Sequence, residues 1–208
     1  MPRYEAKDAP KGSLFGGETT SGRTVLLGGL HPDWYVFANG YRLAADSLVK
    51  RLTDAGMVKE HVCLPVLFLY RHYVELMLKA MLVDLGELDD TDSTVAPNHQ
   101  LAPIWKKFTL KLQALGVQHN QDTLRTIGAW ILELEALDSG SYSFRYPQTK
   151  QGAPSNVIGK TADMTHVYAV MGEIDHVLSG AAAVIDEYLQ LKRESIVSGG
   201  YNQFYYYG

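Results

Sequence analysis

Three charged side chains stand four residues apart in an otherwise apolar stretch, "FLYRHYVELMLKAML", from Phe68 to Leu82. Residues four apart on a helix advance about 40° around its axis, so Arg71, Glu75 and Lys79 would form one ridge. His72 would lie at the edge of that ridge. If exposed, the ridge is a ladder of weak ion pairs. If buried, it must be paired internally, and a paired charge cluster of this kind is a candidate functional site.

Apolar side chains crowd both flanks of this ridge and leave few positions to face water. The crowding residues are Leu67, Phe68, Tyr70, Tyr73, Val74, Met77 and Leu78. We therefore predict that Arg71 and Glu75 are mostly buried and paired, with Arg145 or His99 close by.

Two other patterns offer weaker chemistry. Residues 17–24, "GETTSGRT", have the spacing of a phosphate loop with Arg23 in place of lysine. No buried strand precedes them and no long helix follows, which favours a glycine-rich arm. The seven histidines form no zinc pattern, and a solvated helix face is favoured for Glu173 and His176. We expect no metal and no cofactor.

Helical periodicity predicts the elements that must position these residues. We expect helices over residues 32–56, 62–85, 99–115, 122–137 and 163–195, with Gly56, Gly86 and Gly116 as stops. The fold class is therefore all-α, a bundle of four to five helices. It divides into a glycine-rich arm (1–31), a helical domain (32–195) and an aromatic tail (196–208). The irregular segment 138–163 is long for a compact domain, and such loops are often functional.

Composition excludes several classes of protein. The net charge of −4 gives no global basic field for nucleic acid, and the single cysteine excludes an intrachain disulfide framework. The longest apolar run, near residues 62–70, is far too short to span a membrane. The first residues lack the apolar core of a signal peptide. We expect a cytoplasmic protein with no membrane contact.

Several segments together resemble HEPN-like proteins (higher eukaryotes and prokaryotes nucleotide-binding). They are "LPVLFLYRHYVELMLKAML" at 64–82, "HQLAPIW" at 99–105, "SFRYP" at 143–147 and the long last helix. The resemblance covers residues 32–195 and implies a compact helical bundle that dimerises. Many HEPN-type proteins are metal-independent ribonucleases of bacterial toxin–antitoxin, abortive-infection and CRISPR systems. Others have lost the activity and serve as binding modules.

Active HEPN-type proteins carry an arginine, four to six residues, and then a histidine near the start of a late helix. The nearest match here is Lys160, five residues, and then His166, with Tyr168 two positions further on. The resemblance implies that His166 is a general acid or base and that Lys160 stabilises phosphate charge. Lysine lacks the planar guanidinium with which arginine binds phosphate through two hydrogen bonds. Arg145 is the candidate to supply that guanidinium. The 2′-hydroxyl of RNA would be the nucleophile.

The remaining candidate residues would bind or support. They are Arg71, His72, Glu75, Lys79, His99, Tyr146 and Tyr168. A structural alternative for "FRYP" stays open, with Phe144 in the core, Arg145 paired to Glu75 and Tyr146 as a cap.

Three functions remain open: a ribonuclease toxin or phage-defence effector, a catalytically silent module that binds RNA, nucleotide or protein, and an assembly scaffold. We expect a homodimer with the last or the second helix near its interface.

Gly199 and Gly200 can form a hinge before the aromatic residues of 201–207. We predict that this tail packs on a second copy or a different protein. Stacking on RNA is less favoured, because no Lys or Arg accompanies the rings.

Overall fold

The computed structural model describes residues 33–52, 58–91, 98–116, 120–155 and 157–204, the last eight of these by backbone alone. The chain divides into two units, residues 1–32 and 33–208, and the fold described below is that of the second. The predicted N-terminal arm, including the segment with phosphate-loop spacing, lies outside the described residues. Gly56, the predicted stop of the first helix, also lies outside them, but the prediction that this helix extends to residue 56 is wrong, because the helix already ends at Lys50.

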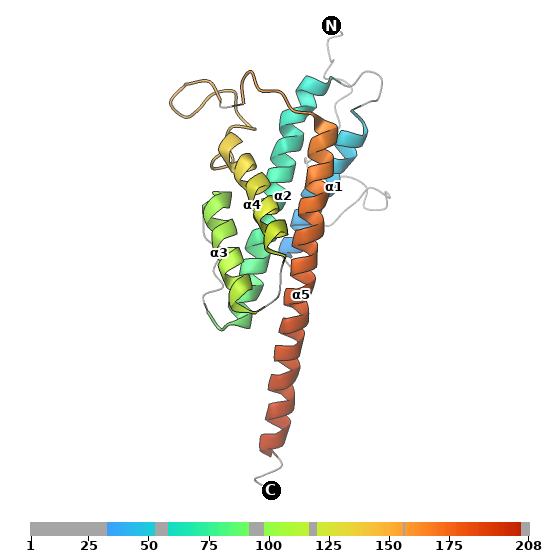
Figure 1. Cartoon of the computed structure of the whole chain (residues 1–208), viewed down its shortest axis with the longest axis vertical. Helices are drawn as coiled ribbons and strands as arrows, with labels where there is room; N and C mark the ends of the chain where they lie inside the picture. The colour runs from blue at the N-terminus through green and yellow to red at the C-terminus, as the bar shows by residue number, and fades with distance from the viewer. Residues whose placement is uncertain (1–32, 53–57, 92–97, 117–119, 156, 205–208) are drawn as a thin grey trace, which may run out of the picture. The chain divides into compact units, whose positions relative to one another are not determined.

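Five helices make up the described part of the chain (Figure 1). They are α1 (Trp34–Lys50), α2 (Lys59–Leu88), α3 (Leu101–Ala114), α4 (Gln121–Leu137) and α5 (Met164–Phe204). Within these residues the extended structure is limited to one isolated bridge, between Gln148 and Pro154. The all-α class is confirmed.

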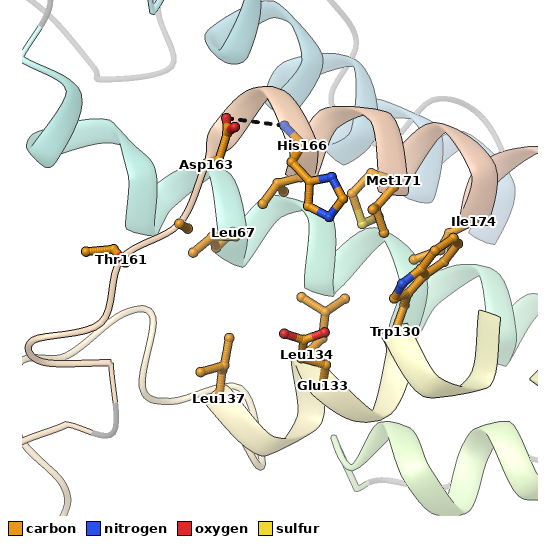
Figure 2. Close-up of a pocket in the computed structure, with 13 residues that line it drawn as sticks. Leu67, Trp130, Glu133, Leu134, Leu137, Thr161, Asp163, His166, Met171 and Ile174 are labelled. Atoms are coloured by element: carbon orange, nitrogen blue, oxygen red, sulfur yellow. Dashed lines mark hydrogen bonds between the residues drawn. The ribbon is translucent and has the colours of Figure 1, made fainter. Parts of the chain in front are cut away.

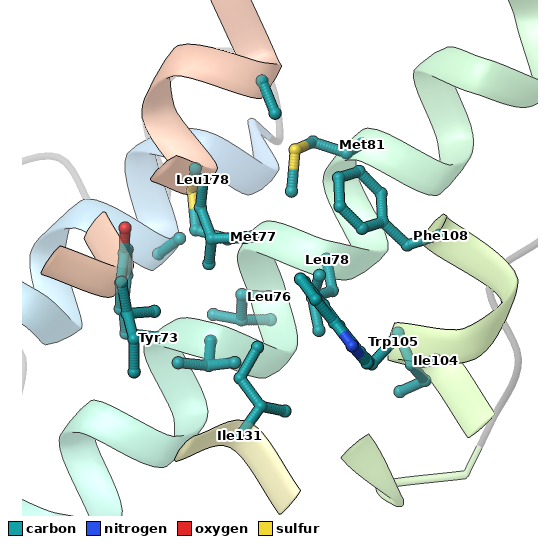
Figure 3. Packing of buried hydrophobic residues seen from close by; sticks show 14 of the residues in the cluster. Tyr73, Leu76, Met77, Leu78, Met81, Ile104, Trp105, Phe108, Ile131 and Leu178 are labelled. Atoms are coloured by element: carbon teal, nitrogen blue, oxygen red, sulfur yellow. The ribbon is translucent and has the colours of Figure 1, made fainter. Parts of the chain in front are cut away.

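Helix α2 is the central element because it is apolar around most of its circumference. It packs against α1, α3 and α5, while α4 packs against α3 and α5. Between Tyr70 and Met81 every residue except His72 is buried. A helix that is hydrophobic all round must be covered on all sides. Figure 3 shows how α3, α4 and α5 supply side chains such as Phe108, Ile131 and Leu178 around α2.

Helices α3 and α4 approach each other closely at Gly128. A Cβ atom added to Gly128 would lie 2.6 Å from Nε1 of Trp105, closer than such contacts normally are. Trp105 is 8% exposed, so its ring has little room to move. The lack of a side chain at Gly128 therefore allows α4 to come this near to α3.

A polar layer joins α1, α2 and α5 within the bundle. The hydroxyl of Tyr70 donates to Asp46 at 2.8 Å, and that of Tyr73 donates to Asp175 at 2.6 Å. Arg42 lies between the two carboxylates, 3.4 Å from Asp46 and 3.3 Å from Asp175. Burial, followed by the hydrogen bond to a carboxylate, strongly raises the pKa of both tyrosines. The layer fixes the register of the three helices.

The ends of α2 differ from the predicted range of 62–85 in two ways. The helix begins earlier, at Lys59, so Pro65 lies inside it and not in its first turn. The carbonyl of His61, which the missing N–H would have bonded, belongs to an exposed residue near the helix start, where water can reach it. Gly86 does not stop the helix either. It is buried, and α2 continues to Leu88.

A lysine from α5 caps the C-terminal end of α2. Nζ of Lys192 donates to the carbonyls of Glu87 at 2.7 Å and Leu88 at 3.1 Å, and it pairs with Asp90 at 2.6 Å. Helix α2 has no basic residue in its own last turn, so this cation satisfies carbonyls that would otherwise lack partners. The contact fixes α5 alongside the end of α2.

Helix α5 is longer than predicted. We expected it to end at Ser195 and to be followed by a glycine hinge, but the helix runs through Gly199 and Gly200 to Phe204. Glycine costs a helix only about 1 kcal/mol relative to alanine and does not by itself end one. The side chains of 197–204 and all of 205–208 lie outside the described residues, so the packing of the aromatic tail stays a prediction.

Candidate functional site

The charged ridge on α2 is buried. Arg71 is fully buried, Glu75 is 1% exposed and Lys79 is 7% exposed. This confirms the predicted burial, and the alternative of an exposed ion-pair ladder is wrong.

Glu75 is the centre of this cluster. Its Oε2 accepts a hydrogen bond from Nη1 of Arg71 at 3.0 Å, and its Oε1 accepts one from Nζ of Lys79 at 2.8 Å. Nδ1 of His99 also lies 2.8 Å from Oε1, as the predicted proximity of His99 requires. Burial alone would raise the pKa of Glu75. The hydrogen bonds from Lys79 and His99 outweigh it and hold that pKa below its ordinary value. The carboxylate is therefore ionised.

The cluster ties α2 to two distant parts of the chain. Arg71 donates through Nε to the carbonyl of Asp138 at 3.0 Å and through Nη2 to the carbonyl of His99. The Asp138 side chain in turn accepts the backbone N–H groups of Tyr142 and Ser143, at the start of the loop after α4. Every arm of the guanidinium is thus used within the protein. This geometry anchors the start of α3 and the end of α4, and because Arg71 is fully buried, its guanidinium is not exposed to a ligand.

His72 belongs to a packing site and not to the charged cluster. Its ring stacks on Phe68 with centroids 5.6 Å apart and meets the edge of Tyr41 at 4.4 Å. Burial lowers the pKa of His72, although the nearby Glu75 acts in the opposite direction. A neutral imidazole packed between two rings fits a structural role.

Arg145 is held by its own loop. Its Nε and Nη2 both donate to the carbonyl of Ser141, and its guanidinium lies over the rings of Phe68 and Tyr146. Phe144 is buried, as the structural alternative for "FRYP" predicts. The Arg145–Glu75 pair in that alternative is wrong, because the guanidinium of Arg145 bonds the carbonyl of Ser141 instead. Tyr146 is 47% exposed, and its ring stacks on the ring of Tyr142.

His166 lines a pocket of about 280 Å³ between α2, α4 and the beginning of α5 (Figure 2). Leu67 comes from α2, Trp130 and Glu133 come from α4, and His166 comes from α5. In Figure 2 the His166 ring and the Glu133 carboxylate both point into the gap between α4 and α5. The pocket therefore combines an imidazole and a carboxylate, those of His166 and Glu133, with apolar lining residues.

Asp163 positions His166 by capping α5. Its Oδ1 accepts the backbone N–H groups of Thr165 at 2.9 Å and His166 at 3.3 Å. An aspartate at this position satisfies donors that the first helical turn leaves free. The cap therefore fixes where the helix starts, and so the direction in which His166 leaves it.

The other residues of the HEPN-like motif do not join His166 in the pocket. Lys160 and Arg145 are exposed and are not among the residues that line it. The backbone N–H of Lys160 instead closes a turn on Val157. Tyr168 lies on a different face of α5 from His166, where its ring is 5.7 Å from Nζ of Lys50 on α1. The spacing in the sequence suggested that these residues form one site with His166, but the fold places them apart from it.

Neither Glu133 nor Trp130 was among the site residues predicted from the sequence. Apolar residues recur along one side of α4, where Ile127 and Ile131 are buried, whereas Trp130, Leu134 and Leu137 are half-buried and line the pocket. The sequence signal that could have located the pocket is this broad apolar stripe on α4. The stripe is wider than the area that α3 and α5 cover, so part of it is left to line a pocket.

No group of three or more metal-ligating side chains comes together within the described ranges. None of the helices described has the length and apolar composition that crossing a bilayer requires.

Comparison with models of known protein families, with curated proteins and with solved structures finds no match to this chain.

Proposed function

We propose that this chain is a HEPN-like binding module that takes its ligand in the pocket beside His166. One observation carries the proposal: the described residues that line this pocket include Glu133, Asp163 and His166 but neither Lys nor Arg. Cleavage of RNA develops negative charge on a phosphate, which preorganised cations or hydrogen-bond donors must stabilise. A pocket with two carboxylates and an apolar floor disfavours such a transition state and favours binding without chemistry.

The resemblance to HEPN-type proteins supplies the setting of the proposal. The chain would be a cytoplasmic component of a bacterial toxin–antitoxin or phage-defence system and would act by engaging a partner molecule. It would work as a homodimer. A monomer mass by light scattering at micromolar concentration would count against that part of the proposal.

A metal-independent ribonuclease is the second candidate function, and the position of His166 favours it. His166 is exposed and stands in the first turn of the last long helix, where active HEPN-type proteins carry their histidine. In a homodimer, Lys160 or Arg145 of a second copy would have to supply the missing cation.

Incubation of the purified chain with total RNA in EDTA separates the two functions. We expect no cleavage by the wild type. The variant His166→Ala tests the pocket, and His176→Ala is its matched control, because His176 is also exposed on α5 but does not line the pocket. Cleavage that is lost in His166→Ala and kept in His176→Ala would overturn the binding proposal and establish the ribonuclease.

A further inference from the structure

The pocket beside His166 has an apolar interior. Leu67 on α2, Leu134 on α4, and Val170 and Ile174 on α5 contribute to its walls. Its volume, about 280 Å³, lies just below the roughly 300 Å³ at which ligand sites in proteins usually begin, so a small ligand fits it best. An interior of this kind gains free energy by removing the apolar body of a small molecule from water.

The carboxylates of the pocket, Glu133 and Asp163, are not balanced by a lysine or arginine among the described lining residues. Glu133 points into the gap from α4, opposite His166, and Asp163 stands at the N-terminal end of α5 (Figure 2). Asp163 already accepts backbone hydrogen bonds as a helix cap, so Glu133 is the carboxylate available to a ligand. Asp163 faces the positive N-terminal end of α5, so Glu133 is the side-chain charge that favours a cation over an anion in this pocket.

An aromatic ring stands beside this carboxylate. Trp130 precedes Glu133 by three positions, so the two side chains leave the same face of α4. Both line the pocket, and Trp130 is partly buried there. Tryptophan is the most favourable aromatic partner for a cation placed over its face. A carboxylate and an indole at this spacing can hold one positively charged group between them.

We infer that the pocket binds a small organic cation, an amine or quaternary ammonium attached to an apolar body. The apolar body would lie against the aliphatic walls, and the cationic group would lie between Trp130 and Glu133. The inference rests on the proposed binding function and specifies its ligand class.

Titration with three probes of matched shape tests the ligand class. The probes are 3-phenylpropylamine (a cation), 3-phenylpropanol (neutral) and 3-phenylpropanoate (an anion), and the readout is the shift of backbone amide NMR signals on the full chain. We expect the amine to bind about three- to tenfold more tightly than the alcohol, the range that an exposed cation–π contact with a nearby carboxylate supports. The carboxylate should bind most weakly. Shifts should concentrate in residues 130–137 and 161–174.

Two variants assign the preference to the residues. Glu133→Gln should bring the amine and the alcohol close to equal affinity, whereas the control Glu173→Gln should keep the wild-type preference, because Glu173 is exposed on α5 outside the pocket. Trp130→Leu keeps an apolar wall and should also reduce the preference for the amine.

Each remaining outcome overturns the inference. Equal binding of amine and alcohol by the wild type would show that the pocket binds neutral ligands as well as cations. The inferred ligand class would then be wrong, whereas the proposed binding function would stand. Tighter binding of the carboxylate, or an unchanged preference in Glu133→Gln, would refute the proposed electrostatics. If none of the probes binds, the ligand class is wrong, whereas RNA cleavage that depends on His166 would refute the proposed binding function itself.

Discussion

Replacing Glu75 with glutamine tests whether the buried cluster holds α2, α3 and α4 together. The change keeps the size of the side chain but removes the charge that faces Arg71 and Lys79, both under one-tenth exposed. Breaking a buried ion pair on one side typically costs about 3–5 kcal/mol. Asp138 and Glu135 also lie near Arg71, at 3.6 Å, and soften the loss. We therefore expect a cost near the lower limit, about 3 kcal/mol.

Thermal unfolding followed by circular dichroism measures this cost. For a chain of this length about 3 kcal/mol corresponds to a fall in Tm of roughly 6–12 °C. The matched control is Glu87→Gln on the same helix. Glu87 pairs with Arg193 at 2.8 Å, but both side chains are about half exposed, so solvent screening leaves little net stabilisation. A Glu75→Gln loss no larger than that of Glu87→Gln would refute a buried, mutually compensated cluster.

The difference in stability between the wild type and Glu75→Gln should also depend on pH. The pKa of Glu75 is lowered in the folded chain from its ordinary value of 4.5. The carboxylate therefore contributes stability that is complete above the ordinary value and is lost as pH falls through the folded value. The difference in unfolding free energy between wild type and Glu75→Gln should shrink as the pH is lowered below about 4.5. A difference that stays constant from pH 7 to pH 3 would contradict this.

Two further substitutions test the packing that positions the pocket. Gly128→Ala gains helix propensity of about 1 kcal/mol but drives a methyl group into the buried Trp105 ring, so we expect a net loss of about 1–3 kcal/mol in urea unfolding. Gly172→Ala is its control on open helix surface and should not destabilise. Tyr73→Phe removes one hydrogen bond to a carboxylate and should cost about 1–3 kcal/mol at pH 7. Because the pKa of Tyr73 is raised, the wild type should lose this advantage as pH rises above the ordinary tyrosine value near 10, and a constant difference at alkaline pH would be inconsistent with that bond.

Local patterns in the sequence were sufficient to locate the helices but not all of their ends, since α1 ends at Lys50 and not near residue 56, and α5 runs to Phe204 and not to Ser195. Periodic apolar residues located all five, and Gly116, which adopts a φ of +70° after α3, stops that helix as predicted. The burial of Arg71 and Glu75 followed from the apolar crowding on both sides of them, which is also a local property. The end of α2 was not predictable in this way, because the lysine that caps it comes from α5.

The pocket depends on three helices that are distant in sequence, and no spacing along the chain encodes it. The five-residue spacing from Lys160 to His166 gave the nearest match to the HEPN-like pattern, yet Lys160 precedes the helix in a separate turn and does not line the pocket. Arg145 is held by a local bond to Ser141, a residue with a φ of +60°. Only a side chain's surroundings in space, and not its neighbours in sequence, decide whether it faces its own loop or a ligand.

The buried cluster on α2 also restricts how this protein can change during evolution. Losing Arg71 alone would leave Asp138 without its cation and would leave Glu75 paired with Lys79 only on one side. Losing Glu75 alone would leave Lys79 without its carboxylate and Arg71 with only the two carboxylates at 3.6 Å. Exchanging all the charged partners together for apolar residues of similar volume can be nearly neutral. The effect of a substitution at one of these positions therefore depends on the residues at the others. We expect lineages of this protein to keep the cluster complete or to replace it as a set, with few intermediate sequences.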